Sequence, residues 1–223
     1  MISVVTGTLN RLNLLPKIIE NTVGSNPNIE LVLVDGGSND GTIDFIKSIN
    51  HERIKLIENG ERSYYWHYMN LGIKESSHEW VCQWNDDIIL ETGWDPIIEE
   101  INKTQCSDFY IFSWKENEKY VIIENDRELV MNYGIYNKKI FREIGMYDSS
   151  YKYYFCDGDM SFRAKSFGYS YTKLQNVKCH PLTEHGPEKR AFMSDAKQES
   201  DNYYEKLEMY KNGKLPSSII KLD

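Results

Sequence analysis

The first half of the chain alternates short apolar runs with segments whose apolar residues recur at helical spacing. The run at 29–35 (IELVLVD) is continuous, which is typical of a strand buried on both faces of a sheet. Other apolar runs lie at 2–6, 53–57 and 79–84. Helical patterns comprise Leu12, Leu15, Ile18 and Ile19, then Ile43, Ile46 and Ile49, then the segment 64–75. This alternation predicts an α/β fold in which right-handed crossovers build a mostly parallel central sheet flanked by helices.

The second half is less regular. Further strands are predicted at 108–114, 119–124 and 129–136. The first two of these runs are close enough in sequence to pair as a hairpin. A helix is expected from 157 to 166, and Tyr203, Leu207 and Tyr210 fit one face of a C-terminal helix. No internal repeat or low-complexity linker separates the halves, so we expect a single domain with a C-terminal helical tail.

Composition and charge limit the kinds of partner. The 223 residues include 34 Asp and Glu against 26 Lys and Arg, a net charge of −8. This balance argues against a nucleic acid polymer as partner, because such a partner attracts a basic surface. No apolar run approaches the roughly 18 residues of a membrane span, so no transmembrane segment is expected. The four cysteines form no Cys-x-x-Cys pair, which favours a cytoplasmic location, or a peripheral one at a membrane.

Polar, turn-forming residues follow three of the predicted strands. These segments are TGTLNR at 6–11, DGGSNDGT at 35–42 and NDD at 85–87. In an open parallel sheet, ligands bind beyond the carboxyl ends of the strands, so the three segments are expected to meet at one binding site. Gly, Asn, Asp and Ser are also the residues that ordinary turns use, which is the structural alternative for each segment alone.

Five segments, in order, carry a family resemblance. They are ISVVTGTLNR (2–11), LVLVDGGSNDGT (31–42), MNLGI (69–73) with WNDDI (84–88), IFREIGMYD (140–148) and YFCDGDMSFRAKSFGY (154–169). The sequence resembles the inverting glycosyltransferases of family 2, over residues 2–186. The resemblance implies the Rossmann-like fold called GT-A. It places the glycosyltransferase domain at 1–190, with a nucleotide-sugar-binding half at 1–90, an acceptor and catalytic half at 91–190, and the helical tail at 191–223.

The implied activity is transfer of a sugar, with inversion and with the help of a metal ion. The donor would be a UDP-, dTDP- or GDP-sugar, and the acceptor a hydroxyl of a glycan or a similar molecule. The Gln-x-x-Arg-Trp signature of processive synthases is absent, so non-processive transfer is expected. One alternative is a sugar-1-phosphate nucleotidyltransferase, because the segment TGTLNRLNLLPK (6–17) loosely resembles the opening motif of that group. Another is a non-catalytic relative that binds glycan or nucleotide, because Asn85 and Cys156 replace the usual acidic residues.

The resemblance assigns donor binding to the first two strand ends. Asp35 occupies the position that contacts the nucleobase, and an ionised Asp only accepts hydrogen bonds, which suits the imide N–H of uracil or thymine. Thr8 and Asn10 are expected to line the same pocket, and Arg11 of the same turn is expected to bind substrate. For Asp40, shaping the turn before Gly41 is expected at least as much as contact with the ligand.

A metal site is implied at the fourth strand end. Asn85 and Asp87 match the outer positions of the Asp-x-Asp metal motif, and Asp86 is expected to point to the donor sugar. Of His180 and His185, which follow the last predicted strand, His180 better fits the position that completes this site. Oxygen ligands suit Mn²⁺ or Mg²⁺, which also bind phosphate oxygens. The structural alternative is a turn of solvated polar side chains.

The catalytic base is expected at the start of the helix predicted from 157. Asp157 matches the family aspartate that removes the acceptor proton, and Asp159 is the nearby alternative with a substrate-binding role. Arg163 lies at the family's substrate-binding arginine position, or forms an i, i+4 ion pair with Asp159. As a structural alternative, both aspartates cap the helix and interact with its dipole.

Aromatic residues cluster in SYYWHYMN at 63–70. Only one face of a helix can be buried, so at least one of these rings is expected to be exposed. Exposed aromatic rings are natural platforms for sugars, and Trp66 is the one we expect in the substrate site. Trp114 and Tyr133 are similar candidates on the acceptor side. Packing in the core is the alternative for each.

Overall fold

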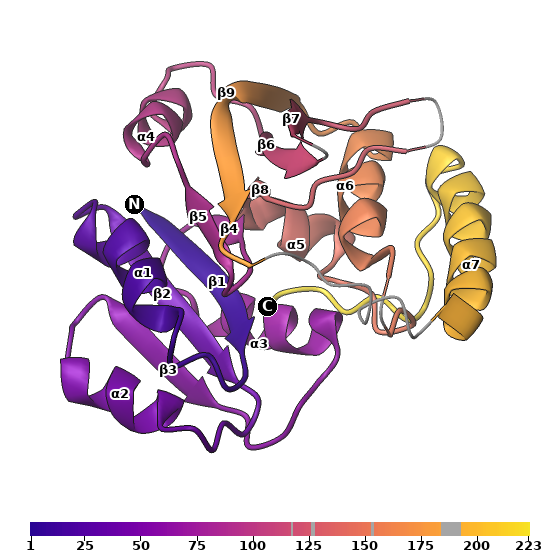
Figure 1. Cartoon of the computed structure of the whole chain (residues 1–223). Helices are drawn as coiled ribbons and strands as arrows, with labels where there is room; N and C mark the ends of the chain where they lie inside the picture. The colour runs from indigo at the N-terminus through magenta and orange to yellow at the C-terminus, as the bar shows by residue number, and fades with distance from the viewer. Residues whose placement is uncertain (117, 126–127, 153, 184–192) are drawn as a thin grey trace.

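The computed structural model describes residues 1–116, 118–125, 128–152, 154–183 and 193–223. These residues form one nine-stranded sheet with helices on both of its faces (Figure 1). The strand order is β3-β2-β1-β4-β8-β6-β9-β5, and β7 pairs with β6. The predicted α/β class, with a central sheet flanked by helices, is confirmed.

The first four strands form the parallel part of the sheet. Its strands are β1 (Ile2–Thr8), β2 (Ile29–Asp35), β3 (Ile54–Glu58) and β4 (Trp80–Gln83). Its helical segments are α1 (Leu15–Ile19), the π-helix η1 (Glu20–Gly24), α2 (Thr42–Ile49) and α3 (Tyr65–Glu75). Thr8 pairs with Asp35, which pairs with Glu58, so three strands end at the same level. Their connecting loops therefore meet at one edge.

The second half of the chain adds a mixed part to the same sheet. Its elements are β5 (Ile88–Leu90), α4 (Asp95–Ile101), β6 (Phe109–Glu116), β7 (Lys119–Val121), β8 (Gly134–Asn137), α5 (Lys138–Ile144), α6 (Cys156–Ser166), β9 (Tyr171–Pro181) and α7 (Met193–Lys211). β8 is antiparallel to β4 and β6, β5 is antiparallel to β9, and β6 and β9 are parallel. The predicted hairpin of 108–114 with 119–124 is confirmed by β6 and β7.

The predicted strand 129–136 is shorter than expected, because β8 begins only at Gly134. Gln83 explains the late start, since its Nε2 donates to the carbonyls of Met131 and Asn132 at 2.7 and 2.9 Å. These carbonyls are thus satisfied by a side chain rather than by a strand ladder. A Cβ at residue 134 would collide with the Tyr110 carbonyl, so glycine permits the close approach of β8 to β6.

Each face of the sheet has its own hydrophobic core. Val4 packs in the core beneath α1 and α4, whereas Val5 packs in the core beneath α3, α5, α6 and α7. Successive strand residues point to opposite faces, so both residues are fully buried. All seven residues of β2 are buried, as the continuous apolar run at 29–35 predicts.

The C-terminal segment packs on the second half of the molecule. Tyr203, Leu207 and Tyr210 are buried, which confirms the predicted helix face of α7. After α7 the chain returns toward the centre of the molecule (Figure 1). There Ile220 accepts a backbone hydrogen bond from Met146 at 2.8 Å. Among the described residues, no helix combines the length and apolarity needed to cross a lipid bilayer.

Gly72 fixes the distance between α3 and the parallel strands, which leads to a stability prediction. A Cβ at this position would lie inside van der Waals contact with Val5 and 3.3 Å from Val34. We expect Gly72→Ala to lower the free energy of unfolding by about 1–2 kcal/mol in urea titration, because overpacking exceeds the gain in helix propensity. Lys74→Ala, exposed on the same helix, is the control and should change it by less than about 0.5 kcal/mol. A stabilised Gly72→Ala variant would contradict this packing.

Candidate active site

A cavity of about 820 Å³ opens at the carboxyl edge of the parallel strands. It is lined by the loop after β1, the end of β2, the loop after β3, the first turn of α3, Asp86 and Lys152. Thr8, Asn10, Arg11 and Asp86 are the sequence-predicted site residues that line it. The strand ends therefore meet at one concave site, as their order along the chain predicts.

The loops after β1 and β2 are bonded to each other. The Asn10 amide donates to Ser38 Oγ at 2.8 Å, and Asn10 Oδ1 accepts from the Asn39 amide at 2.8 Å. Asp40 accepts from the amides of Thr42 and Leu12, so it shapes the turn as expected and also connects the two loops. Hydrogen bonds from Thr42 hold the pKa of Asp40 below its usual value. This network fixes one wall of the cavity.

Asp35 organises the turn that follows β2. Its fully buried carboxylate accepts from the amides of Gly37 and Ser38 through Oδ1, both at 2.8 Å, and from Ser38 Oγ through Oδ2. Gly37 has a φ of +89°, and a Cβ there would lie 2.6 Å from the Gly60 carbonyl. Asp35 is not among the residues that line the cavity, whereas the adjacent Gly36 is.

Thr8 offers the cavity an unsatisfied hydroxyl. Its side chain is 4% exposed. Within the described part of the chain, its Oγ1 is buried without a hydrogen-bond partner. Burying a hydroxyl without a hydrogen-bond partner costs free energy, because the hydroxyl loses its hydrogen bonds to water. A polar ligand group in the cavity would supply the missing partner.

Three cationic side chains surround the same space. Arg11, Arg62 and Lys152 line the cavity together with one carboxylate, Asp86. Arg11 Nε lies 3.4 Å from Asp86 Oδ2. The site is therefore locally cationic although the chain carries a net charge of −8. Such a field attracts anionic ligands.

Arg62, Lys152 and Asn59 line the cavity but were not among the sequence-predicted residues. Asn59 and Arg62 follow β3, whose carboxyl end is level with those of β1 and β2. The strand-end rule that found the other loops applies equally to this one. Lys152 lies in the loop before α6, and no spacing or motif in the sequence marks it.

Three tyrosines at the start of α3 form one wall of the cavity, called here the tyrosine wall. Tyr64, Tyr65 and Tyr68 line the cavity, and Tyr64 is 41% exposed, which confirms the expected exposed ring in 63–70. Tyr68 packs against Gly7, where a Cβ would lie within 3.0 Å of its ring. Burial and the neighbouring charge of Asp86 raise the pKa of Tyr68, so its hydroxyl stays protonated.

The aromatic residues chosen from the sequence lie elsewhere. Trp66 does not line the cavity, and its ring packs edge-on against His67 with centroids 5.3 Å apart. Trp114 and Tyr133 belong to the core beneath α1 and α4. Both side chains therefore pack in the core, which is the structural alternative to a substrate-binding role.

Of the predicted metal residues, Asn85 and Asp87 lie in the turn between β4 and β5, and His180 lies on β9. Asn85 Nδ2 donates to the Tyr133 hydroxyl at 3.3 Å, so its carbonyl oxygen is not used in that bond. Asp87 is almost fully buried and accepts from Thr183 Oγ1 at 3.2 Å. His180 Nδ1 lies 3.2 Å from Glu91 Oε1, on the strand pair of β9 with β5.

The donor set at this turn fits a hard divalent cation in part. Asp86, Asp87 and Asn85 present oxygen atoms of the kind that Mg²⁺ and Mn²⁺ prefer. Across the described residues, no three His, Cys, Asp or Glu side chains gather into a complete metal site. His180 contacts Glu91 instead of joining this set. His185 lies outside the described residues.

Asp157 lies in the first turn of α6, beside the tyrosine wall. Its charge contributes to the raised pKa values of Tyr65 and Tyr68, after burial and nearer groups. Asp157 Oδ1 accepts from the Gly158 amide at 2.9 Å. Burial raises the pKa of Asp157 in spite of that bond. The carboxylate is therefore more basic than an ordinary aspartate.

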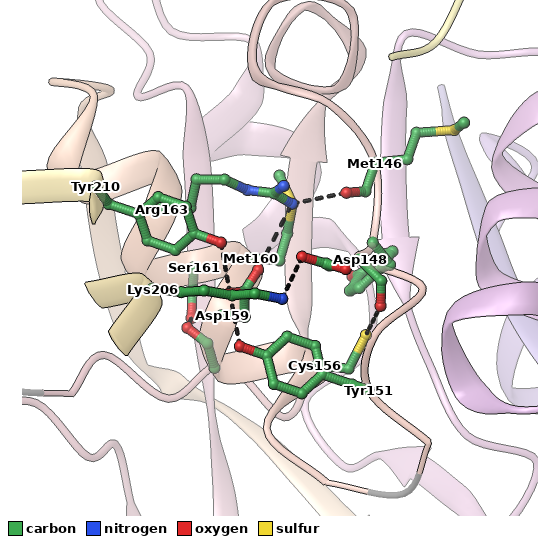
Figure 2. Close-up of polar contacts among 12 residues, drawn as sticks. Met146, Asp148, Tyr151, Cys156, Asp159, Met160, Ser161, Arg163, Lys206 and Tyr210 are labelled. Carbon is green, nitrogen blue, oxygen red and sulfur yellow. Dashed lines mark hydrogen bonds and ion pairs between the residues drawn. The ribbon is translucent and has the colours of Figure 1, made fainter. Parts of the chain in front are cut away.

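Asp159 and Arg163 are fully buried and do not line the cavity. Figure 2 shows Asp159 accepting hydrogen bonds from the hydroxyls of Tyr151 at 3.0 Å and Tyr210 at 2.6 Å. Arg163 Nη2 donates to the Met146 carbonyl at 2.7 Å and lies 3.9 Å from Asp159 Oδ2. The i, i+4 ion pair is thus present, and neither side chain reaches the cavity lining where substrate contact was expected.

Fold and site together define a nucleotide-binding type of α/β protein, with an anion-attracting cavity at the strand ends. Residues 3–167 match the model of Glycosyl transferase family 2, and the chain therefore belongs to this family of glycosyltransferases. A comparison with curated proteins found no significant match.

Solved structures share the GT-A fold at low sequence identity. A mannosyltransferase from Pyrobaculum calidifontis, in complex with GDP-Man and Mn²⁺, is similar with a TM-score of 0.69 and 16% identity, over 96% of this chain and 65% of that one. S. aureus TarS 1–349 in complex with UDP gives a TM-score of 0.68 and 16% identity, over 93% and 65%. The UDP-GlcNAc complex of TarS 1–349 gives 0.64 and 16%, over 85% and 60%. The chain thus spans less than two thirds of each of these structures.

The raised pKa of Asp157 predicts a conflict between stability and ionisation. A carboxyl group whose folded-state pKa is raised favours folding below its unfolded pKa, and this contribution is lost as pH rises through the folded pKa. We therefore expect Asp157→Asn, which keeps the acceptor for Gly158, to be more stable than wild type at pH 7. Thermal melts at pH 4 and pH 7 measure this, and the difference should shrink at pH 4. Equal stability at both pH values would contradict the assignment.

Proposed function

We propose that the protein is a metal-dependent, inverting glycosyltransferase that moves a sugar from a nucleoside diphosphate sugar to a hydroxyl of a glycan or similar acceptor. The observation that carries this proposal is the locally cationic cavity at the ends of β1, β2 and β3. A nucleoside diphosphate is an anion, and the guanidinium groups of Arg11 and Arg62 suit phosphate oxygens. The exposed tyrosine ring at its rim offers a stacking surface for a base or a sugar.

The nucleotide of the donor is proposed by analogy as UDP, GDP or dTDP. The mannosyltransferase neighbour is in complex with GDP-Man, and TarS is in complex with UDP-GlcNAc. The Thr8 hydroxyl and the loop at Asn10 are proposed to bind the donor beside Arg11. A cytoplasmic location is part of the proposal, because the four cysteines of the chain are free.

A divalent cation is proposed at the β4–β5 turn, held by Asp87 and Asn85. When bound, Mn²⁺ or Mg²⁺ would supply Lewis-acid stabilisation of the diphosphate leaving group. Asp86 is proposed to face the donor sugar, since it lines the cavity beside Arg11. The neighbouring mannosyltransferase was solved with Mn²⁺, which supports the choice of ion.

Asp157 is proposed as the general base that takes the proton of the acceptor hydroxyl. A base works best when its pKa approaches the working pH, and burial moves the pKa of Asp157 in that direction. Attack from the side opposite the leaving diphosphate inverts the anomeric centre. The reaction forms one glycosidic bond, breaks the bond to the diphosphate, and moves the acceptor proton to Asp157.

A panel of UDP-, GDP- and dTDP-sugars tests the transferase reaction. We expect release of a nucleoside diphosphate in the presence of Mn²⁺, and a loss of kcat of at least about a hundredfold in Asp157→Asn. Nucleotide binding by this variant should persist. Release of pyrophosphate from a nucleoside triphosphate would favour a nucleotidyltransferase instead. Nucleotide binding without any turnover would favour a non-catalytic relative.

Metal dependence has a test of its own. Treatment with EDTA should abolish turnover, and added Mn²⁺ or Mg²⁺ should restore it, because the leaving diphosphate needs charge neutralisation. We expect Asp87→Asn to raise the Mn²⁺ concentration for half-maximal activity by about tenfold or more. Asp44→Asn, in the first turn of α2, is the matched control and should leave this concentration unchanged. Full activity in EDTA would contradict the metal site.

A further inference from the structure

Lys152, from the second half of the chain, lines the cavity at the ends of the parallel strands, where the donor is proposed to bind. Among the described residues that follow Asp86 in the sequence, Lys152 alone lines the cavity. The side chain is exposed, and the ammonium forms no ion pair with a carboxylate of the described residues. It also borders a second cavity, of about 470 Å³, against α7. With open space on both sides, the ammonium is available to an anionic ligand.

The backbone around Lys152 is held by Glu199 of α7. Glu199 is buried, with Oε1 accepting from the Lys152 amide at 2.7 Å and Oε2 accepting from the Tyr154 amide at 2.8 Å. One carboxylate thus binds two amides of the same loop. Hydrogen bonds from amides to an ionised carboxylate are stronger than those between neutral groups.

Neighbouring residues of α7 secure both sides of this loop. Lys206 Nζ donates to Asp148 Oδ2 at 2.6 Å, ahead of the loop (Figure 2). Tyr203 stacks on Phe155, which follows the loop, with ring centroids 5.1 Å apart. Lys152 therefore extends from a backbone that α7 holds before, at and after its position.

We propose that Lys152 binds the diphosphate of the donor, and that Glu199 is the positioning residue that holds Lys152 at the cavity. This inference rests on the proposed function and adds α7 to the donor site. Arg11 and Arg62 approach the cavity from the first half of the chain, and Lys152 approaches it from the second half. A diphosphate between them would be neutralised from both sides.

Calorimetric titration of the full chain with UDP, GDP, UMP and GMP, in the presence of Mn²⁺, tests the role of Lys152. We expect Lys152→Gln to bind the nucleoside diphosphate about tenfold more weakly than wild type, with a smaller loss for the monophosphate, because one charged hydrogen bond to phosphate is removed. Lys197→Gln, exposed on α7 and paired with Asp201, is the matched control. Unchanged diphosphate affinity in Lys152→Gln would overturn the proposal.

Glu199→Gln tests the positioning role, because an amide offers only one acceptor oxygen to the two backbone amides. We expect weaker diphosphate binding and a raised donor KM. The double variant with Lys152→Gln should bind no more weakly than Lys152→Gln alone. Glu208→Gln, exposed on α7, is the control and should behave as wild type. Equal losses for diphosphate and monophosphate, or losses that add in the double variant, would overturn the positioning role.

Two further measurements keep these outcomes separate. If circular dichroism shows that Glu199→Gln does not fold, Glu199→Asp replaces it, because aspartate keeps the charge and should recover part of the affinity. Binding like that of wild type by a folded Glu199→Gln would overturn the positioning role. A Glu199→Asp variant that binds as weakly as Glu199→Gln would also overturn it. If wild type binds no nucleotide and turns over no donor sugar, the proposed function fails. If wild type binds and turns over but Lys152→Gln matches it, only the present inference fails.

Discussion

The buried pair of Asp148 and Lys206 is the interaction on which the second half of the molecule depends. Both side chains are buried, and burial alone would raise the pKa of Asp148. The hydrogen bond from Lys206, together with those from Ser150 and Ser218, instead holds the pKa of Asp148 below its usual value. Breaking a buried pair of this kind costs about 3–5 kcal/mol, because the remaining charge stays buried without its partner. The pair thereby fixes the position of α7 and of the returning C-terminal segment against α6.

The position of α7 also determines where two residues of the candidate active site lie. The loop between Asp148 and α6 carries Lys152, and α6 begins with the turn that holds Asp157. Asp159 and Arg163 add a second buried connection, since Tyr210 of α7 donates to Asp159 (Figure 2). The first turn of α6 is therefore fixed from behind by the same helix that fixes the loop before it. Asp159 and Arg163, which the family resemblance predicts to bind substrate, therefore lie in the contact between α6 and α7 and not in the cavity lining.

The parts of the fold that follow from local rules were predictable from the sequence. The continuous apolar run 29–35 predicts a strand buried on both faces, and Asp40 shapes its turn with its immediate neighbours. Glu199 could not be found in this way, because it contacts amides 45 to 47 positions away and no pattern marks its partners. The full burial of Asp159 could not be predicted for a related reason. A motif identifies a residue type at a position, but the depth of that residue depends on α7, which packs against it from far along the chain.

The acidic composition and the cationic cavity are compatible because most acidic groups near the site are already engaged. Asp35 binds amides of its own turn, Asp86 lies beside Arg11, and Asp148 pairs with Lys206. The field in the cavity is then set by the cations that remain available. Asp157 differs from these carboxylates, because burial raises its pKa and only backbone amides oppose that shift. A fold optimised for stability alone would pair or neutralise this group, so its persistence is the kind of local conflict that functional sites contain.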